Sequence, residues 1–318
     1  MGTFSEEYFQ EEWREGFFIE SMMKRAWAAE MEVLEEIDRI CKKHKIQYFA
    51  DSGTLLGAVR HQGFIPWDDD IDIAMKRMDY QRFMQVAPGE LPEGWVLCNP
   101  FITKEWELPF SRLINSHKVN FTQEHLDRFH GCPYVVGVDI FPLDNKPDDE
   151  EEAEMIYCLM KIIYGTILAI QNKEIEEAER LIKDIENMLN VTVNREGNVL
   201  NQLFCLVDQL GCTYLEDETE EVALWSWWAY MDKVRNYKRS WFSDSEERKF
   251  EHMMLPIPVG YDSLLRVIYG DDYMVPQRID GYHDYPFYKK QEELLRARGD
   301  QKNSESRDEK NNIFIEVL

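Results

Sequence analysis

Four aspartates crowd the stretch PWDDDIDIAM, at positions 68, 69, 70 and 72 of the chain. Side chains of an extended strand point alternately to its two faces, so Asp68, Asp70 and Asp72 are predicted to share one face and Asp69 the other. Carboxylates gathered on one face repel each other unless a cation lies between them, and hard oxygen ligands favour Mg²⁺ or Mn²⁺ over zinc. The pattern predicts a metal site, with Asp69 tolerant of replacement.

Two other interpretations fit an acidic run. A solvated acidic turn is the commonest, but here the run follows Pro66 and Trp67 and leads into an apolar strand. A calcium loop of the EF-hand type needs glycine at its sixth position and glutamate at its twelfth. Ile73 and Asp79 occupy those positions, so a calcium loop is disfavoured.

Further residues extend the predicted metal site toward phosphate chemistry. Gly53 and Thr54 lie between a short strand and a helix, where backbone N–H groups can receive a phosphate. Asp139 lies on a second predicted strand, YVVGVDIFPLD. Carboxylates from neighbouring strands can hold one or two metal ions against a phosphate ester while one of them accepts a proton from an incoming hydroxyl. These residues predict phosphoryl or nucleotidyl transfer.

The composition limits the partners. The 318 residues include 61 acidic and 36 basic side chains, for a formal net charge of −25. Such a charge repels nucleic-acid phosphate and anionic lipid, so no nucleic-acid partner is expected, whereas a divalent cation can bridge acidic side chains to a nucleotide. The six cysteines have no metal-binding spacing and are expected to be reduced. Neither a signal peptide nor a membrane-spanning run is expected, which favours the cytoplasm.

The elements that must position these residues follow from periodicity. Apolar residues at three- and four-residue spacing predict an amphipathic helix over 21–46, followed by a strand at 47–50 and a short helix at 55–63. Residues 70–75 alternate polar and apolar as a half-buried strand does. From 147 to about 236 the pattern is helical; its densest aromatic patch, ALWSWWAYMDK, is interpreted as core rather than as a binding platform.

Three segments resemble, in the same order, the hallmark blocks of a known family. They are YFADSGTLLGAVRHQGFIPWDDDIDIAM, VDIFPLD and LPIPVGYDSLLRVIYGDDYM, within about residues 45–285. The blocks closely resemble those of the LicD family of phosphocholine transferases, relatives of the fukutin group within the nucleotidyltransferase-fold superfamily. The first block is long and specific, and the other two support it.

The resemblance implies an α+β fold, with a mixed β-sheet core of the nucleotidyltransferase type flanked by helices and a helical insertion. On this basis the chain divides into five parts. They are an N-terminal helical segment (1–44), the catalytic core (45–150), a helical insertion or subdomain (151–240), a C-terminal family block packed on the core (241–297) and a mostly disordered tail (298–318).

The resemblance also assigns the carboxylates. Asp70 and Asp72 match the family's metal-binding pair, and Asp68 stands where the fukutin-like branch has a further aspartate on the metal side. Asp139 fits the third carboxylate and is the best candidate for the general base or for a further metal ligand. In this assignment Asp70, Asp72 and Asp139 are catalytic, all four aspartates are metal ligands, and Mg²⁺ or Mn²⁺ is the cofactor.

Five residues are assigned to substrate binding. Gly53 and Thr54 match a Gly-Ser turn that contacts the donor phosphate. Arg60, at the end of the GAVR run, is either a phosphate contact or an ion-pair partner of the aspartates. Arg112 stands where relatives usually have lysine, and His283 resembles a late family histidine whose alternative is a structural role.

The implied reaction moves phosphocholine, or a similar phosphoalcohol, from a CDP-alcohol such as CDP-choline to a hydroxyl of a glycan and releases CMP. The acceptor is expected to be a surface polysaccharide such as teichoic acid, lipopolysaccharide or a precursor, reached from the cytoplasm by peripheral contact at the inner face of the membrane. Two alternatives stay open: a nucleotidyltransferase that moves NMP from an NTP to a small molecule or sugar, and a non-enzymatic metal- or nucleotide-binding protein.

Overall fold

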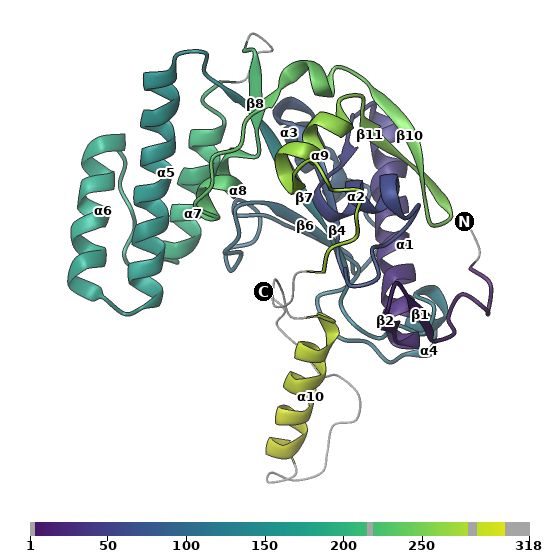
Figure 1. Ribbon diagram of the computed structural model, residues 1–318. Helices are drawn as coiled ribbons and strands as arrows, with labels where there is room; N and C mark the ends of the chain where they lie inside the picture. The colour runs from purple at the N-terminus through teal and green to yellow at the C-terminus, as the bar shows by residue number, and fades with distance from the viewer. Residues whose placement is uncertain (1–3, 215–218, 279–284, 303–318) are drawn as a thin grey trace.

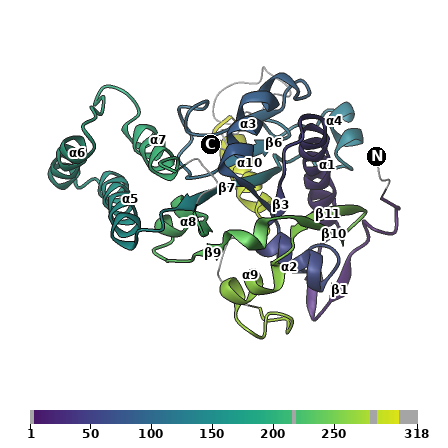
Figure 2. The same cartoon turned by 90° about the horizontal axis from the view of Figure 1, so that it is seen from above.

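The computed structural model describes residues 4–214, 219–278 and 285–302. A β-sheet with its covering helices forms one body of the molecule (Figure 1). Beside it stand three helices, α5 (Glu150–Gln171), α6 (Ile175–Leu189) and α7 (Val199–Gly211), which lie together in both perpendicular views (Figures 1 and 2).

The central sheet has seven strands. Its main path runs through β3 (Phe49–Ala50), β4 (Ile71–Lys76), β7 (Gly137–Lys146), β6 (Ser111–Ile114) and β5 (Val96–Cys98). Strands β4 and β7 are parallel, and the other neighbours on this path are antiparallel. The far end of β7 also pairs with β8 (Glu221–Ala223), which pairs in turn with β9 (Tyr237–Lys238). The predicted α+β fold with a mixed sheet is confirmed.

Helix α1 (Ser21–His44) is the predicted amphipathic helix, and it ends where Lys45 adopts a left-handed conformation with φ of 55°. Its apolar stripe is buried in the main core, where Trp27 stacks on Phe64 with ring centroids 4.8 Å apart. The same indole donates a hydrogen bond through Nε1 to the carbonyl oxygen of Asp68, at 3.0 Å. Packing of α1 therefore fixes the backbone at the start of the aspartate run.

Helix α2 (Ser52–Arg60) begins and ends three residues before the helix predicted over 55–63. Gly53 and Thr54, predicted to form a turn ahead of the helix, lie in its first turn instead. The chain enters this helix through Ser52, whose φ of 46° is in the left-handed region that side chains rarely adopt. The sharp entry lets the helix start directly at the end of β3, which sequence periodicity does not predict.

A second apolar core holds α5, α6 and α7 together with α8 (Trp225–Tyr230), and we call these four helices the helical lobe. The segment predicted to be helical is not purely so, because β8 and β9 lie within it and extend the central sheet. Arg77, the first residue of α3 (Arg77–Val86), also joins the two parts. Its buried guanidinium donates to Asp144 on β7 at 2.6 Å and to Asp208 on α7 at 2.8 Å.

Among the described residues, α5 is the one helix that is long and apolar enough to cross a membrane, judged by length and composition alone. The sequence reasoning, which expected no membrane-spanning run, did not single it out. Of its most apolar stretch, 44% is buried inside the structure, and it packs against the other helices of the lobe. Core helices of compact proteins meet the same criterion, so this finding is weak evidence for a span.

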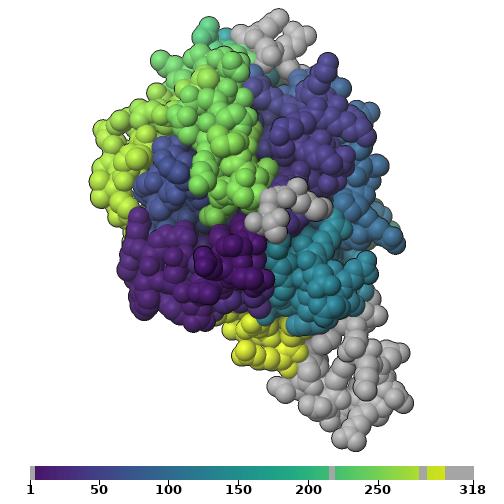
Figure 3. Space-filling view, turned by 90° about the vertical axis from the view of Figure 1, so that its right-hand side faces the viewer, coloured from purple at the N-terminus to yellow at the C-terminus, as the bar shows by residue number. Residues whose placement is uncertain are grey.

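Two hairpins are absent from the sequence prediction. The first, β1 (Glu12–Arg14) with β2 (Phe17–Ile19), precedes α1, so the N-terminal segment is not helical throughout. The second pairs β10 (Ser245–Phe250) with β11 (Met253–Pro258). Figure 3 shows this second hairpin in green on the outside of the molecule, near the dark purple N-terminal segment. Neither hairpin carries a clear polar–apolar alternation on both strands, because β2 (FFI) and β11 (MMLPIP) are almost wholly apolar, which explains why both were missed.

Three more helices complete the described chain: α4 (Gln123–Arg128), α9 (Tyr261–Tyr269) and α10 (Tyr288–Lys302). Helix α9 lies within the C-terminal family block, and it ends where Gly270 takes a φ of 91°, a conformation that favours glycine. Helix α10 protrudes from the body (Figures 1 and 3) and continues five residues into the tail predicted to be disordered from residue 298. The rest of that tail lies outside the described residues.

Candidate active site

A cavity of about 960 Å³ lies beside the sheet, at the upper end of the size range of small-molecule sites. Four carboxylates line it together: Asp68, Asp70, Asp72 and Asp139. The first three come from the run before and within β4, and the fourth comes from β7, the parallel neighbour of β4. The alternation predicted for the aspartate run is therefore observed, because its even-numbered members face one cavity.

The other members of this acidic region point elsewhere. Asp69 is only 3% exposed, and its Oδ2 accepts a hydrogen bond from the backbone N–H of Phe287 at 2.6 Å. Asp69 was predicted to tolerate replacement. Its burial and its hydrogen bond with the segment before α10 oppose that prediction. Glu30 of α1, missed by the sequence reasoning, is also buried, and burial followed by repulsion from Asp69 and Asp70 raises its pKa well above the ordinary value.

Strand register places three charged residues in one row across the sheet. Asp72 on β4 is the partner of Asp139 on β7, and Asp139 is the partner of Arg112 on β6. Arg112 donates through Nε to one oxygen of Asp139 and through Nη2 to the other, the second bond being 2.7 Å. Burial lowers the pKa of Arg112, but Asp139 more than offsets this, so the pKa is raised. Arg112 does not line the cavity. It was predicted to bind the substrate, but its guanidinium is bonded to Asp139.

The carboxyl of Asp72 is strongly perturbed. Burial, followed by repulsion from Asp70 and Asp139, raises its pKa well above the ordinary value. A positive charge against these oxygens would reverse the repulsion. Perturbed carboxyls that line a cavity are typical of functional sites, so this part of the cavity is the candidate reaction centre.

Helix α2 supplies a wall of the cavity directly beside the aspartates. Gly53 lines the cavity, and a Cβ placed on it would lie 2.3 Å from Oδ2 of Asp68, so glycine is needed for this close approach. Thr54 is buried, and its Oγ1 accepts a hydrogen bond from the backbone N–H of Asp72 at 2.9 Å. Thr54 therefore positions β4 and does not face the cavity as predicted for a phosphate contact. Ser52, which sequence reasoning did not select, lines the cavity in its place.

Cationic side chains line another part of the cavity. Arg60 does so as predicted, and its Nη1 donates to the carbonyl oxygen of Tyr273 at 2.7 Å. In the described part of the chain it forms no ion pair with the aspartates, so that alternative is not observed. Lys233 and Arg235 also line the cavity, and the guanidinium of Arg235 lies 4.5 Å from the centre of the Trp228 ring. Sequence reasoning missed both residues, because no motif around them indicates that this segment lies close to the aspartates in the folded chain.

The aromatic patch in ALWSWWAYMDK serves two purposes. Trp225 is buried in the core of the helical lobe, as predicted. Trp227 lines the cavity, where its ring centroid lies 5.6 Å from that of Phe110 and 5.5 Å from that of Phe141. The three rings form an aromatic wall, so the interpretation of the whole patch as core is only partly correct.

The predicted metal ligands can be compared with this arrangement. Within residues 4–214, 219–278 and 285–302, no three carboxyl, histidine or cysteine side chains lie close enough together to form a ready-made metal centre. The donor set nevertheless fits Mg²⁺ or Mn²⁺ in its chemistry, because hard carboxylate oxygens share one cavity, and burial followed by repulsion from its neighbours raises the pKa of the Asp72 carboxyl. His283, the remaining predicted residue, lies outside the described residues.

The mixed sheet, with an aspartate on each of two neighbouring parallel strands, is the architecture expected of a nucleotidyltransferase-like protein. Residues 45–156 match the family model described as "LicD/FKTN/FKRP, nucleotidyltransferase domain". The chain is 52% identical over 256 residues to "Lipopolysaccharide cholinephosphotransferase LicD" of Haemophilus influenzae, a match that covers 79% of this chain and 91% of that protein.

An uncharacterized protein of Rickettsia typhi is 40% identical over 85 residues, 25% of this chain and 28% of that protein. An uncharacterized protein of Rickettsia prowazekii is 44% identical over 57 residues, 18% of this chain and 21% of that protein. The chain belongs to the LicD family. This confirms the resemblance drawn from the three sequence blocks and the prediction that the protein is an enzyme of the transferase class.

Proposed function

We propose that this enzyme transfers phosphocholine from CDP-choline to a hydroxyl of a lipopolysaccharide or a related surface glycan and releases CMP. The observation that supports this best is the cavity lined by Asp68, Asp70, Asp72 and Asp139, in a chain 52% identical to a lipopolysaccharide cholinephosphotransferase. The volume of about 960 Å³ is sufficient for a nucleotide with its phosphoalcohol.

Asp70 and Asp72, with Asp68, would hold Mg²⁺ or Mn²⁺ in this proposal. The ion supplies charge stabilisation at the transferring phosphate when it is bound. Neutralising the cluster would also relieve the repulsion from Asp70 and Asp139 that, after burial, raises the pKa of Asp72. Asp139 can contribute an oxygen only while sharing it with Arg112, since both of its oxygens accept hydrogen bonds from that guanidinium.

The donor phosphates would lie against the first turn of α2, where the N–H groups of a helix start favour an anion, beside the carboxylate of Asp68 that rests on Gly53. Arg60, Lys233 and Arg235 line the same cavity and offset the charge of the diphosphate. The wall formed by Trp227 and its neighbours offers ring faces, which attract a quaternary ammonium group.

The acceptor hydroxyl must lose a proton as it attacks phosphorus. Asp72 and Asp139 face each other across β4 and β7, and either is placed to accept that proton. Both oxygens of Asp139 already accept hydrogen bonds from Arg112, so Asp72 is favoured for this role. We place the reaction in the cytoplasm, with the enzyme in peripheral contact with the inner face of the membrane.

The proposal is tested by incubating the protein with CDP-choline, Mg²⁺ or Mn²⁺ and lipopolysaccharide lacking phosphocholine. We expect CMP in solution and phosphocholine on the glycan. Asp70→Asn should abolish both products without changing the melting temperature, while Asp184→Asn on the surface of α6 should have no effect. Full turnover by Asp70→Asn would refute the assignment, and pyrophosphate released from CTP in place of CMP would favour nucleotidyl transfer.

A further inference from the structure

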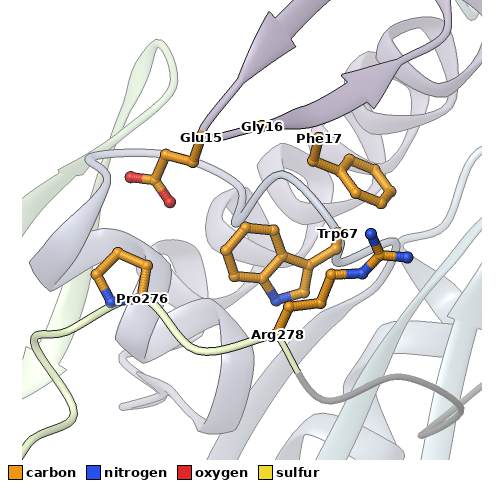
Figure 4. Close-up of a pocket in the computed structure, with 6 residues that line it drawn as sticks. All are labelled: Glu15, Gly16, Phe17, Trp67, Pro276 and Arg278. Atoms are coloured by element: carbon orange, nitrogen blue, oxygen red, sulfur yellow. The ribbon is translucent and has the colours of Figure 1, made fainter.

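A smaller pocket of about 310 Å³ adjoins the active-site cavity (Figure 4). Its lining consists of Glu15, Gly16, Phe17, Trp67, Pro276 and Arg278, and we call it the side pocket. Phe17, Trp67 and Arg278 line both spaces, so the two share a wall. Trp67 directly precedes Asp68 in the sequence. A molecule in the side pocket therefore lies next to the carboxylates.

The lining combines aromatic surface with one charge of each sign. Figure 4 shows Trp67 in the middle of the pocket, Glu15 and Phe17 on the side of the first hairpin, and Pro276 and Arg278 on the opposite side. The rings of Phe17 and Trp67 are 6.2 Å apart and inclined at 69°, so they form two walls of a corner. The guanidinium of Arg278 lies 4.8 Å from the centre of the Phe17 ring.

This combination discriminates between the groups that the proposed reaction must bind. A trimethylammonium group would be attracted by Glu15 and repelled by Arg278, and a phosphate the reverse, so neither gains a net electrostatic preference for the pocket. A sugar ring carries no charge and presents C–H groups on its face and hydroxyls around its edge. It can therefore pack on Trp67 while its hydroxyls donate to a carboxylate and accept from a guanidinium.

Glu15 is held at the pocket by an unusual turn. Glu15 and Gly16 connect β1 and β2 with φ of 51° and 75°, which defines a two-residue turn with both central residues in the left-handed region. Asparagine, aspartate or glycine is favoured at the first of these positions, so glutamate there carries a conformational cost. Its Oε2 lies 3.2 Å from Nε2 of His61, which keeps the carboxylate in a defined place.

We propose that the side pocket binds a neutral sugar ring of the glycan acceptor, with Trp67 as the packing surface and with Glu15 and Arg278 as hydrogen-bonding partners of its hydroxyls. The assignment rests on the proposed transfer to a glycan. It places the acceptor next to the active-site cavity that holds the carboxylates and leaves the aromatic wall around Trp227 to the donor.

The turn itself provides a sharp test. Glu15→Asn creates the Asn-Gly sequence that this kind of turn prefers, so the variant should fold at least as well as the natural protein while losing the reach of the carboxylate. We expect the KM for lipopolysaccharide to rise about tenfold, with the KM for CDP-choline and kcat within about twofold of the unchanged protein. The matched control is Glu11→Asn, an exposed residue of the same segment outside the pocket.

An unchanged KM for lipopolysaccharide in Glu15→Asn would overturn the assignment. If the unchanged protein releases no CMP from CDP-choline, the proposed function fails instead, and calorimetric titration with the lipid-free oligosaccharide of lipopolysaccharide then decides the matter. Binding that is weakened by Glu15→Asn and not by Glu11→Asn would support the side pocket, and equal binding by all three proteins would refute it.

Discussion

The carboxylate of Asp68 rests so close to the α-carbon of Gly53 that a methyl group on the glycine would lie 2.3 Å from Oδ2. The two residues belong to different elements, since Gly53 is in the first turn of α2 and Asp68 precedes β4. Because Gly53 has no side chain, the carboxylate of Asp68 can occupy this place next to α2.

Gly53→Ala should therefore impair activity without unfolding the protein. The added methyl group displaces the end of a flexible side chain, which costs little stability, and alanine is favoured over glycine within a helix by up to about 1 kcal/mol. We expect kcat/KM for CDP-choline to fall at least about tenfold, because Asp68 is moved. The matched control is Gly165→Ala on α5, where a new Cβ meets nothing within 4 Å. Equal activities of the two variants would contradict the role given to Asp68.

Arg112 and Asp139 should behave as a coupled pair. Arg112→Gln removes the partner of both carboxylate oxygens and should lower the free energy of unfolding by about 2 kcal/mol. Asp139→Asn in the same chain should restore part of that loss, because no unpaired charge then remains. Urea unfolding of the two single variants and the double variant gives the coupling energy. Strictly additive effects would mean that the pair is not coupled.

Arg77 should be more important for stability than any exposed cation. Its guanidinium is 1% exposed and contacts Asp144 and Asp208, so Arg77→Met removes the cation that both carboxylates share. We expect the free energy of unfolding to fall by about 3 to 5 kcal/mol. Lys183→Met on α6 should change it by no more than about 0.5 kcal/mol. A loss for Arg77→Met as small as that of the control would show that the lobe is held by apolar packing alone.

The stability of the unliganded protein should depend on pH through Asp51, which is 1% exposed. Burial raises the pKa of this carboxyl from 3.8 to about 6, in spite of the hydrogen bond donated by Ser52. Since the folded-state pKa is the higher one, its contribution to stability is present below about pH 4 and is lost as the pH rises through about 6. The difference corresponds to about 3 kcal/mol.

Asp51→Asn imitates the protonated form and should remove this dependence. The free energy of unfolding of the variant, relative to the unchanged protein, should increase by about 3 kcal/mol between about pH 4 and about pH 7.5. Denaturant titrations at the two pH values measure the difference. If the free energies of unfolding of the two proteins differ by the same amount at both pH values, the charge on Asp51 does not destabilise the folded state.

Divalent cations should stabilise the protein in a pH-dependent way. Above the raised pKa of Asp72 the aspartates repel each other, so Mn²⁺ at about 100 times its Kd should raise the free energy of unfolding by about 2.7 kcal/mol. At lower pH protons compete for the same oxygens and the gain should shrink. Thermal melts with and without EDTA measure it, with Asp72→Asn as the variant that should lose the effect. Stabilisation that persists in Asp72→Asn would place the ion elsewhere.

The arrangement of the aspartate cluster could be predicted because it depends on local geometry. Alternation along the strand places Asp70 and Asp72 on one face and Asp69 on the other. Asp139, on a second buried strand, could be predicted to join the cluster for the same reason. The roles that differ from prediction all depend on contacts distant in sequence. Thr54 turns inward because α2 starts earlier than its periodicity indicates, and Arg112 is committed to Asp139 by the register of β6 on β7.

Residues that the sequence does not point to reach the site through the fold alone. Glu15 arrives on a short hairpin and Trp227 on a helix of the lobe, and neither lies in a segment that resembles the family blocks. Their amino-acid types are common in protein surfaces and cores, so only the three-dimensional arrangement distinguishes them. Periodicity reports which face of an element is buried, and it carries no information about which elements meet.

Strand β7 carries Asp139 near one end and Asp144, the partner of Arg77, near the other. Five residues of extended chain separate them, roughly 17 Å at the usual rise of a strand. The first half of the strand is hydrogen-bonded between β4 and β6, and the second half pairs with β8. One continuous, hydrogen-bonded strand therefore carries both a carboxylate of the active-site cavity and the residue that ties the helical lobe to the sheet.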